Sequence, residues 1–381
     1  MAEAVIVEAV RSPVGKRNGG LSGVHPGELS AQVLNGLVQR AGVDPALVDD
    51  VIWGCVMQAG EQALDIARTA VLAAGWPESV PGVTVDRQCG SSQQSVHFAA
   101  AGVVAGHYDI VVAGGVESMS RTPMGASLAN GGHPYPEAFR ARYTQTPNQG
   151  VGAEMIAEQW GFDRTALDQF SLGSHEKAAA AQDSGAFDDQ IVAIKDQDGN
   201  AVLKDEGIRR GGTVEKMATI KPAFKEDGVI HAGNASQISD GSAALLFMSA
   251  EKAKELGLKP LAKVHTAVLA GADPVIMLTA PIPATQKALK RSGLSVDQIG
   301  VFEVNEAFAP VPLAWLKDIG ADEKNLNPNG GAIALGHPLG GSGARIMTTM
   351  LYHMRDKGIQ YGLQTMCEGG GQANATILEL L

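Results

Sequence analysis

The chain has 381 residues, of which 45% are hydrophobic and 19% are charged, so it contains enough apolar material for a large core and does not resemble a disordered protein. Its formal net charge is −11. Nucleic acid and anionic membranes are therefore not expected as main partners, because phosphate binding needs clustered Lys and Arg. At this length we expect more than one domain.

Cysteine usage points to a reducing compartment. The chain has Cys55, Cys89 and Cys367 and no C-x-x-C pair, which argues against a disulfide framework or a zinc site. The sequence opens on a strand-like run without a signal-like stretch, and no apolar run reaches the roughly 18 residues of a spanning helix. We therefore expect a cytoplasmic protein with no membrane association.

Strand-like and helical patterns alternate through the first third of the chain. In order, the pattern predicts strand Val5–Val10, helix Pro26–Ala41, strand Val48–Trp53, a helix near Ala63–Ala74, strand Val83–Asp86, helix Ser92–Ala105 and strand Asp109–Ala113. Such alternation is typical of βαβ units and favours a largely parallel sheet with both faces covered by helices.

A similar order returns near the C-terminus. Here the pattern predicts strand Ala262–Ala270, helix Pro283–Ser292, strand Gly300–Val304, helix Gly343–Arg355 and strand Tyr361–Met366. In both regions a glycine turn is followed by a helix, a strand and consecutive glycines. This weak internal symmetry indicates two similar α/β halves that face each other.

Residues 118 to about 237 fit neither half. They contain several prolines, a helical stretch near Thr165–Ala181 and a basic segment from Lys204 to Lys225. Long insertions in compact folds are usually lids or binding loops, which favours a lobe over the site rather than a flexible insertion without function. By pattern alone the basic segment is better interpreted as a solvated loop, because acidic residues lie among its Lys and Arg.

Cys89 and His337 each follow a strand or a glycine turn and directly precede a helix. The partial positive charge at a helix N-terminus favours a thiolate, which would make Cys89 a candidate nucleophile. Gly336 and Pro338 frame His337 and hold it out from its turn, where a neutral imidazole could act as a base. The alternatives are a core cysteine and a structural histidine.

Cys367 and Asn305 follow predicted strands of the C-terminal region. Three glycines come after Cys367 and Glu368, and such a run lets a ligand approach the backbone. A second thiol could donate and accept a proton if its neighbours bring its pKa near neutrality. Asn305 could fix a water that serves as an oxyanion donor. A core cysteine and an ordinary turn are the alternatives.

Together these blocks resemble the active-site blocks of the thiolases in order and spacing, and the resemblance runs almost the full length of the chain. The blocks are Cys89 with its following helix, Asn305-Glu306-Ala307-Phe308, Gly336-His337-Pro338 and Cys367 with its glycines. Gly114-Gly115-Val116-Glu117-Ser118-Met119-Ser120 and Ala232-Gly233-Asn234-Ala235-Ser236 are also similar to the family.

The resemblance implies a fold and a division of the chain. The expected fold is α/β and thiolase-like, with two similar halves of mixed, mainly parallel sheets in αβαβα layers and an inserted loop lobe. The N-terminal half would comprise residues 1–117 and 238–260, the CoA-binding lobe residues 118–237, and the C-terminal half residues 261–381.

It also implies the chemistry. Cys89 would carry the acyl group, His337 would activate Cys89, and Cys367 would exchange the proton of the acetyl-CoA carbanion. His337 and a water on Asn305 would stabilise the enolate. The backbone N–H groups of Cys89 and Gly369 would stabilise the tetrahedral intermediates. Coenzyme A would be a substrate, and neither a metal nor a permanently bound cofactor is expected.

Substrate contacts are implied in the same way. Ser236 would bond the pantetheine arm, Arg209 would lie near the nucleotide, and Phe308 would line the acyl pocket. The chain departs from many short-chain thiolases, which carry His-Met-Gly at Asn148-Gln149-Gly150 and a glycine-rich run at Met277-Leu278-Thr279. Gly90-Ser91-Ser92-Gln93-Gln94 resembles degradative thiolases of actinobacteria, some of which act on sterol side chains.

The resulting expectation is CoA-dependent cleavage of 3-ketoacyl-CoA to acetyl-CoA and a shortened acyl-CoA in a reversible ping-pong cycle. The expected partners are acyl-CoA and CoA, within a homodimer or homotetramer. The alternatives are a biosynthetic thiolase that forms acetoacetyl-CoA and a catalytically silent acyl-CoA-binding protein. A decarboxylative condensing enzyme would usually lack the second cysteine, and a cysteine hydrolase would turn over without CoA.

Overall fold

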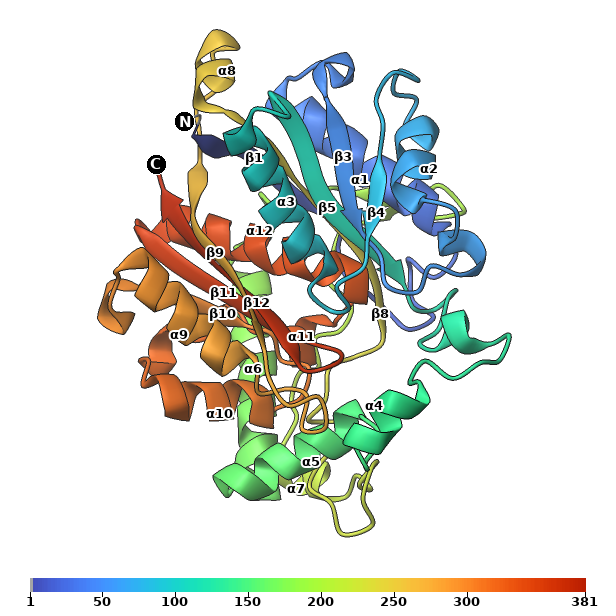
Figure 1. Cartoon of the computed structure of the whole chain (residues 1–381), viewed down its shortest axis with the longest axis vertical. Helices are drawn as coiled ribbons and strands as arrows, with labels where there is room; N and C mark the ends of the chain where they lie inside the picture. Colours follow the sequence, from blue (N-terminus) through green and yellow to red (C-terminus); the bar gives the residue numbers. More distant parts are fainter. Residues whose placement is uncertain (1–2) are drawn as a thin grey trace.

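The computed structural model describes residues 3–381 and is built around a single ten-stranded sheet (Figure 1). Its strands run in the order β10-β11-β12-β9-β1-β8-β5-β3-β4, and β2 pairs with β8. The two halves meet where Val5 and Ile6 of β1 pair with Lys263 and Ala262 of β9. The strands are β1 (Ala4–Arg11), β2 (Gly15–Lys16), β3 (Asp50–Gly54), β4 (Val83–Val85), β5 (Ile110–Ser118), β8 (Ser239–Ser249), β9 (Ala262–Gly271), β10 (Val301–Val304), β11 (Tyr361–Glu368) and β12 (Gln372–Leu380).

The sheet is mixed, as predicted, but the prediction that it is mainly parallel is wrong. Strand β3 pairs in parallel with β4 and β5, and β10 pairs in parallel with β11. The pairs β5–β8, β1–β8, β1–β9, β9–β12 and β11–β12 are antiparallel. Parallel neighbours need a crossover such as a helix, whereas the hairpin between β11 and β12 and the long insertion between β5 and β8 both allow the chain to reverse direction.

Helices form three layers around the two halves of the sheet (Figure 1). Helices α1 (Pro26–Ala41) and α2 (Ile66–Ala73) cover the outer face of the N-terminal half, and α9 (Pro281–Ser292) and α10 (Pro310–Ile319) cover that of the C-terminal half. Between the halves lie α3 (Ser91–Ala105) and α12 (Leu339–Lys357), which share one apolar cluster with strands from both. The expected αβαβα layering is therefore confirmed.

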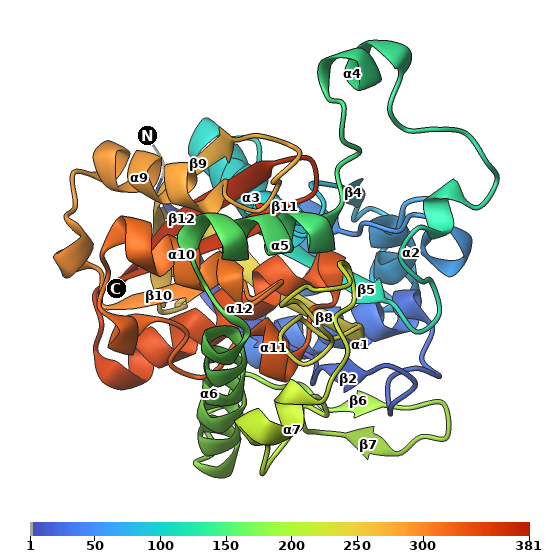
Figure 2. The same cartoon turned by 90° about the horizontal axis from the view of Figure 1, so that it is seen from below.

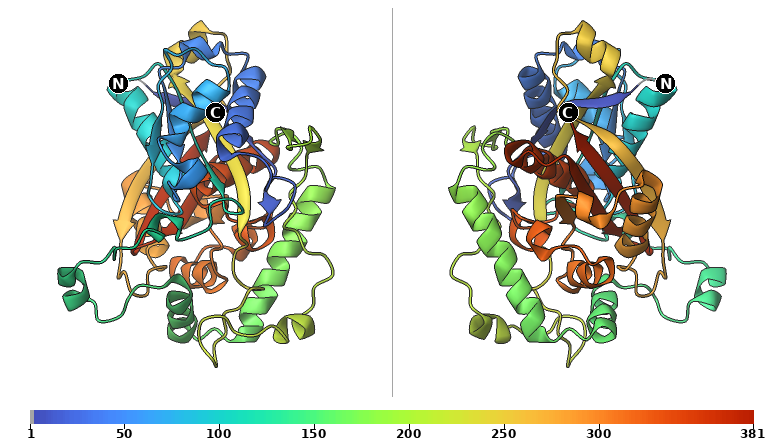
Figure 3. Two further views of the ribbon diagram at one scale, coloured as in Figure 1. Left: turned by 90° about the vertical axis from the view of Figure 1, so that its right-hand side faces the viewer. Right: turned by 90° about the vertical axis from the view of Figure 1, so that its left-hand side faces the viewer.

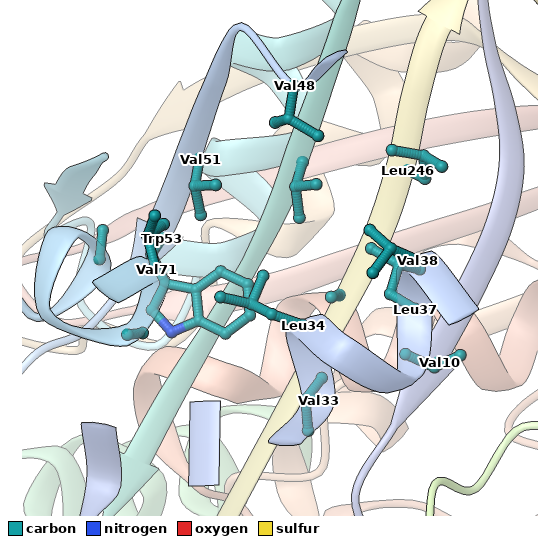
Figure 4. Close-up of a cluster of buried hydrophobic side chains, with 14 of the residues drawn as sticks. Val10, Val33, Leu34, Leu37, Val38, Val48, Val51, Trp53, Val71 and Leu246 are labelled. Carbon is teal, nitrogen blue, oxygen red and sulfur yellow. The ribbon is translucent and has the colours of Figure 1, made fainter. Parts of the chain in front are cut away.

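Helix α1 shows how local sequence builds the outer layer. Its N-cap His25 accepts a hydrogen bond from the N–H of Gly27, and Gly42 ends the helix at a φ of 66°. Leu34 and Leu37 are fully buried and pack beside Trp53 of β3 (Figure 4). Truncating one such leucine to alanine costs about 2–5 kcal/mol, so this face fixes α1 on the sheet.

The insertion between β5 and β8 lies along one side of the body and extends beyond it. In Figure 2, α4 sits at the tip of a long loop that projects away from the sheet, and Figure 3 shows α6 running along the lower part of the molecule. Helix α6 packs against α11 (Ala332–Leu335), and α5 packs against α10. The elements of the insertion are α4 (Glu137–Arg142), α5 (Gln149–Trp160), α6 (Arg164–Asp183), β6 (Ile194–Lys195), β7 (Ala201–Val202) and α7 (Val214–Ala218).

The remaining elements are short. Helix α8 (Ala250–Glu255) follows β8, and 3₁₀ turns occur at Pro45–Leu47, Gly60–Gln62, Ala126–Leu128, Val296–Gln298 and Glu323–Asn325. Across residues 3–381, none of the helices combines the length and the apolar character needed to cross a bilayer.

Candidate active site

Cys89 lies in a tight turn between β4 and α3. Gln88 adopts a left-handed φ of 49°, which is uncommon for a non-glycine residue and marks a constrained turn. The Ser91 hydroxyl donates to the carbonyl of Gln88 at 2.5 Å and accepts from the N–H of Arg87 at 3.0 Å. The thiol is thereby held just ahead of the first turn of α3, and the Cys89 residue is only 5% exposed.

The environment of Cys89 opposes its ionisation. Burial raises the pKa of the Cys89 thiol well above its ordinary value, and negative charge on Cys367 or Glu368 raises it further. Burial therefore opposes, in the free site, the thiolate that the helix N-terminus was expected to favour. A proton acceptor is required before Cys89 can attack.

His337 occupies the turn between α11 and α12, where Gly336 has a φ of 100°. Its Nδ1 lies 2.6 Å from the Ser342 hydroxyl, which itself donates to the carbonyl of Pro338 at 2.8 Å. The Ser342 oxygen must then accept from Nδ1–H, which leaves Nε2 as the ring nitrogen that carries the lone pair. Burial, with a smaller contribution from Arg345, lowers the pKa of His337 to about 3, so the ring is neutral.

The first turns of α3 and α12 pack against each other. The N–H of Ala344 donates to the Ser92 hydroxyl at 2.9 Å, and a Cβ on Gly343 would lie 2.3 Å from the backbone nitrogen of Gln93. Leu339 belongs to the same apolar cluster as Cys89. The turns that carry Cys89 and His337 therefore meet at one junction between the two halves of the fold.

Cys367 and Asn305 come from neighbouring parallel strands. The N–H of Asn305, just after β10, donates to the carbonyl of Thr365 in β11 at 3.1 Å. Its side-chain amide nitrogen lies 3.5 Å from Nε2 of His337, and its Oδ1 is buried without a hydrogen-bond partner among residues 3–381. Asn305 therefore lies next to His337 with one acceptor atom free.

Cys367 is buried more deeply than Cys89. Burial and negative charge on Glu368 raise the pKa of Cys367 to about 12, and the hydrogen bond from Asn305 lowers it. The expectation that neighbouring groups bring this pKa near neutrality is wrong for the free site, because the thiol is only 1% exposed. Cys367 is thus a protonated thiol, which suits a proton donor.

A cavity of about 730 Å³ opens over Cys89. Five of the predicted site residues line this cavity and come from both halves and the insertion: Cys89, Asn148, Gln149, Met277 and Gly369. Asn148 also caps α5 through its Oδ1, which accepts from two backbone N–H groups, so its side chain has a structural task as well. Met277 is held at a left-handed φ of 62°.

Phe308 and Ser236 are not among the residues that line this cavity. The N–H of Ser236 donates to the carbonyl of Ala307 at 2.9 Å, which joins its loop to the segment after β10. Phe308 packs in one apolar cluster with Cys367 and Met277, and its ring meets that of Phe224 edge-on at 5.9 Å. This cluster forms an apolar wall behind Cys367.

Arg209 lies apart from Cys89 and lines a separate hollow of about 260 Å³ along α6. Its N–H donates to Nδ1 of His175 at 3.0 Å. The neighbouring Arg210 is paired with Asp183 through both guanidinium nitrogens, whereas no ion pair within residues 3–381 involves Arg209. A larger hollow of about 830 Å³ between α1 and the β6–β7 hairpin contains none of the predicted residues.

Glu117 at the end of β5 was missed as a site residue by sequence reasoning. Its fully buried carboxylate accepts from the N–H groups of Val56, Met57 and Gly340 and from the Gln62 side chain, at 2.7–3.1 Å. It thereby ties a cavity loop to the start of α12. The only signal in the sequence was its position in the block that begins at Gly114.

Ser342 and Glu368 were also missed. Ser342 lies five positions after His337, a spacing that a helical first turn could have indicated. Glu368 lies between Cys367 and the three glycines and is fully buried. Among residues 3–381, no three His, Cys, Asp or Glu side chains are grouped as a metal site would require.

Comparison with known proteins places this chain and its fold among the thiolases. Residues 4–251 match the family described as "Thiolase, N-terminal domain", and residues 258–380 match "Thiolase, C-terminal domain". The chain therefore belongs to the thiolase family, and the predicted family, fold class and acyltransferase type of enzyme are confirmed.

Individual relatives cover the whole chain. It is 50% identical to the steroid 3-ketoacyl-CoA thiolase FadA6 of Mycobacterium tuberculosis, across 100% of this chain and 95% of the relative. It is 46% identical to a 3-ketoacyl-CoA thiolase of Escherichia coli, across 100% of both chains. The crystal structure of the Bacillus anthracis acetyl-CoA acetyltransferase superposes with a TM-score of 0.92 at 41% identity, across 100% of this chain and 99% of that one.

Proposed function

We propose that this thiolase cleaves 3-ketoacyl-CoA with coenzyme A and that Cys89 carries the acyl group. The observation that carries the proposal is a buried thiol on a cavity of about 730 Å³, in a turn that packs against the segment following the neutral imidazole of His337. A cavity of this size lies within the range of small-molecule sites.

The cycle begins when Nε2 of His337 takes the Cys89 proton. The sulfur attacks the 3-keto carbon, the bond between C2 and C3 breaks, and Cys367 donates its proton to C2 of the leaving acetyl-CoA enolate. The CoA thiol loses its proton to Cys367, attacks the acyl-Cys89 carbonyl and releases the shortened acyl-CoA. The His337 proton returns to Cys89, so protons balance over the cycle.

Developing negative charge would be stabilised in two places. Once protonated, Nε2 of His337 becomes a donor to the enolate oxygen, and a water on the unpartnered Oδ1 of Asn305 would supply the second hydrogen bond. The backbone N–H groups of Cys89 and Gly369 would hold the tetrahedral oxyanions. Removing one such donor typically costs about 2.7–4 kcal/mol of barrier.

The insertion would bind coenzyme A, with residues 118–237 as a lobe between an N-terminal half (1–117 and 238–260) and a C-terminal half (261–381). The absence of an ion pair at Arg209, next to the paired Arg210, supports a role for Arg209 at the nucleotide phosphates. Ser236 would bond the pantetheine arm. Arg209→Gln should weaken CoA binding about tenfold, whereas Arg210→Gln, the matched control, should change it little.

The acyl substrate would be larger than acetoacetyl-CoA. Asn148, Gln149 and Met277 line the cavity where many short-chain thiolases carry other residues, and Phe308 would close the acyl pocket from behind. The name of the mycobacterial relative, a steroid 3-ketoacyl-CoA thiolase, supports a bulky acyl group and the cleavage direction. The second candidate is acetoacetyl-CoA chemistry, which the similarity to the Bacillus anthracis acetyltransferase favours.

We also propose a homodimer or homotetramer in the cytoplasm. Strand β4 pairs only with β3 among the described strands, and Val83 on this sheet edge is 43% exposed. An unpaired edge is a site for pairing with another chain. Light scattering of the purified protein would give the subunit number, and a monomer that is fully active would contradict this part of the proposal.

The decisive experiment measures CoA-dependent cleavage of acetoacetyl-CoA, a long-chain 3-ketoacyl-CoA and a bulky 3-ketoacyl-CoA. Cys89→Ser should abolish turnover, whereas Cys55→Ser, the matched change at another buried cysteine, should retain it. Mass spectrometry should find the acyl adduct on Cys89. The ranking of kcat/KM separates the two substrate classes, and CoA binding without any turnover would leave a silent acyl-CoA-binding protein.

A further inference from the structure

Glu368 places a carboxyl group directly behind the nucleophile. It is the last residue of β11, and neighbouring strand residues point to opposite faces, so it turns away from the apolar cluster around Cys367. The carboxyl faces the turn at Gly90, where an added Cβ would lie 2.0 Å from Oε1 of Glu368. Any side chain at position 90 would therefore collide with this carboxyl.

No side chain donates a hydrogen bond to the buried Glu368 carboxyl. Both of its oxygens lack a side-chain partner within residues 3–381, the residue is 0% exposed, and the backbone N–H of Asn374 is the donor that favours the carboxylate. A buried carboxylate with so few donors is costly, and such a group reduces the cost by remaining protonated. This differs from Glu117, whose two oxygens accept four hydrogen bonds.

The charged and polar groups near the Glu368 carboxyl come from several elements. From the loop before α3 it is approached by Arg87, Asp86 and Cys89, and from its own strand by Cys367. Strand β12 contributes the amide of Asn374, which donates to the carbonyl of Gly90 at 3.0 Å, and the amide of Gln372, which accepts from Arg87. Further along α3, His97 is bonded to Thr376. Within residues 3–381, Arg87 is the cation that lowers the pKa of Glu368, and its Nη1 donates to Gln372.

The charge of Glu368 affects both thiols in the same direction. Burial raises the pKa of Glu368 to about 8, and Arg87 opposes that rise. Once ionised, Glu368 raises the pKa of Cys89 and that of Cys367. Burial opposes ionisation of both cysteines in either case, and a carboxylate adds a like charge behind them that a neutral carboxyl does not.

We propose that Glu368 is a positioning residue that gates the ionisation of both cysteines, permitting thiolate formation while protonated and suppressing it when ionised. The inference rests on the proposed function for its role in turnover. Its electrostatic part concerns thiol ionisation alone and is measured without substrate. The gate would make the acid–base pair of this site less reactive in alkaline solution.

The test follows iodoacetamide alkylation of Cys89 and Cys367 by peptide mass spectrometry in the full-length protein. Below about pH 7 wild type and Glu368→Gln should react at equal rates, because Glu368 is neutral there. Above about pH 8 the variant should become faster, approaching about tenfold, since a like charge within a few ångströms shifts a pKa by about one or more. Glu368→Asp keeps the charge and should retain the wild-type profile.

A second variant keeps the inference open to contradiction if Glu368→Gln folds poorly. Arg87→Gln removes the cation that favours the carboxylate, so the rate suppression should begin at higher pH than in wild type. Superimposable profiles for wild type and Glu368→Gln, or equal effects of Gln and Asp at every pH, would overturn the inference. Absence of thiolase turnover in the wild-type protein, with the alkylation difference intact, would instead contradict the proposed function and leave this inference standing.

Discussion

Glu117 accepts a hydrogen bond from the backbone N–H of Gly340 at 2.8 Å, which joins the end of β5 to the first turn of α12. The same carboxylate holds the N–H groups of Val56 and Met57. Met57 lines the cavity over Cys89, so one buried side chain fixes the cavity wall relative to the helix that follows His337.

Replacing Glu117 with Gln should destabilise the fold. The new amide NH₂ would face two donors that now bond to one carboxylate oxygen, and each unsatisfied buried donor costs about 1–3 kcal/mol. Urea unfolding would measure the loss. Glu61→Gln is the matched control, because Glu61 pairs with Arg121 at the surface and should contribute no more than about 1 kcal/mol. Equal losses in the two variants would refute the role of Glu117.

Ser342→Ala should reduce kcat while leaving the KM for CoA nearly unchanged. Ser342 accepts from Nδ1–H of His337 and thereby keeps the lone pair on Nε2. We expect a loss of about tenfold or more, smaller than the roughly 10⁴-fold loss when the orienting Asp of a Ser-His-Asp triad is changed. Steady-state kinetics would test it.

Thr348→Val is the control for Ser342→Ala in the same helix. Thr348 also donates to the carbonyl four residues earlier but contacts no histidine by a hydrogen bond. The kcat of Thr348→Val should match that of the wild type. If it falls as far as the kcat of Ser342→Ala, the loss comes from a disturbed helix and not from the tautomer of His337.

His231→Ala should raise the KM for CoA more than it lowers kcat. Nδ1 of His231 accepts from the N–H of Gly233, so Nε2 carries the proton and donates to Asp168 of α6 at 2.7 Å. This contact fixes the loop that carries Ser236. Losing it should cost about one hydrogen bond, or roughly tenfold in CoA affinity.

Isothermal titration with CoA would measure the effect of His231→Ala directly. His265→Ala is the control, since His265 lies on β9 and its ring is hydrogen-bonded to the neighbouring Thr266. Unchanged CoA affinity in His231→Ala would show that the loop keeps its position without this contact.

His97 makes stability depend on pH. Burial lowers the pKa of His97 in the folded state to about 4, below its unfolded value near 6.5. The unfolded chain therefore binds one more proton below about pH 6.5, and stability falls as the pH drops toward 4. His97→Gln should reduce the slope of unfolding free energy against pH by about 1.4 kcal/mol per pH unit in that window.

Urea unfolding between about pH 4.5 and 7 would provide the slope for His97→Gln. The exposed His107 is the matched control, and His107→Gln should keep the wild-type slope. If the two variants have the same slope, another group accounts for the acid sensitivity.

Much of the fold follows from local sequence. Helix α1 has the predicted bounds, because its apolar spacing and its terminal glycine Gly42 both act locally. Strand β8 was not predicted: all eleven of its residues are buried, so it lacks the alternation that marks a strand with one exposed face. Helix α5 was not predicted, because it follows an irregular loop. The role of Asn148 as its N-cap depends on hydrogen bonds that only the structure shows.

The candidate site could likewise be predicted from the sequence only in part. The glycine frames of Cys89 and His337 could be read from the sequence because they are local. The ionisation of Cys89 could not, since the groups that bury and charge it come from β11, far along the chain. Glu368 is a further case, as its importance depends on facing Gly90.

The central layer also sets an order of events during synthesis. Helix α3 is covered by α12, which begins only at Leu339, and the two share one apolar cluster. A ribosome-bound chain that ends before this point leaves the inner face of the N-terminal half and Cys89 exposed to solvent. The nucleophile therefore becomes buried only after α12 has been synthesised. Until then the nascent chain exposes an apolar surface, which favours early contact with a chaperone.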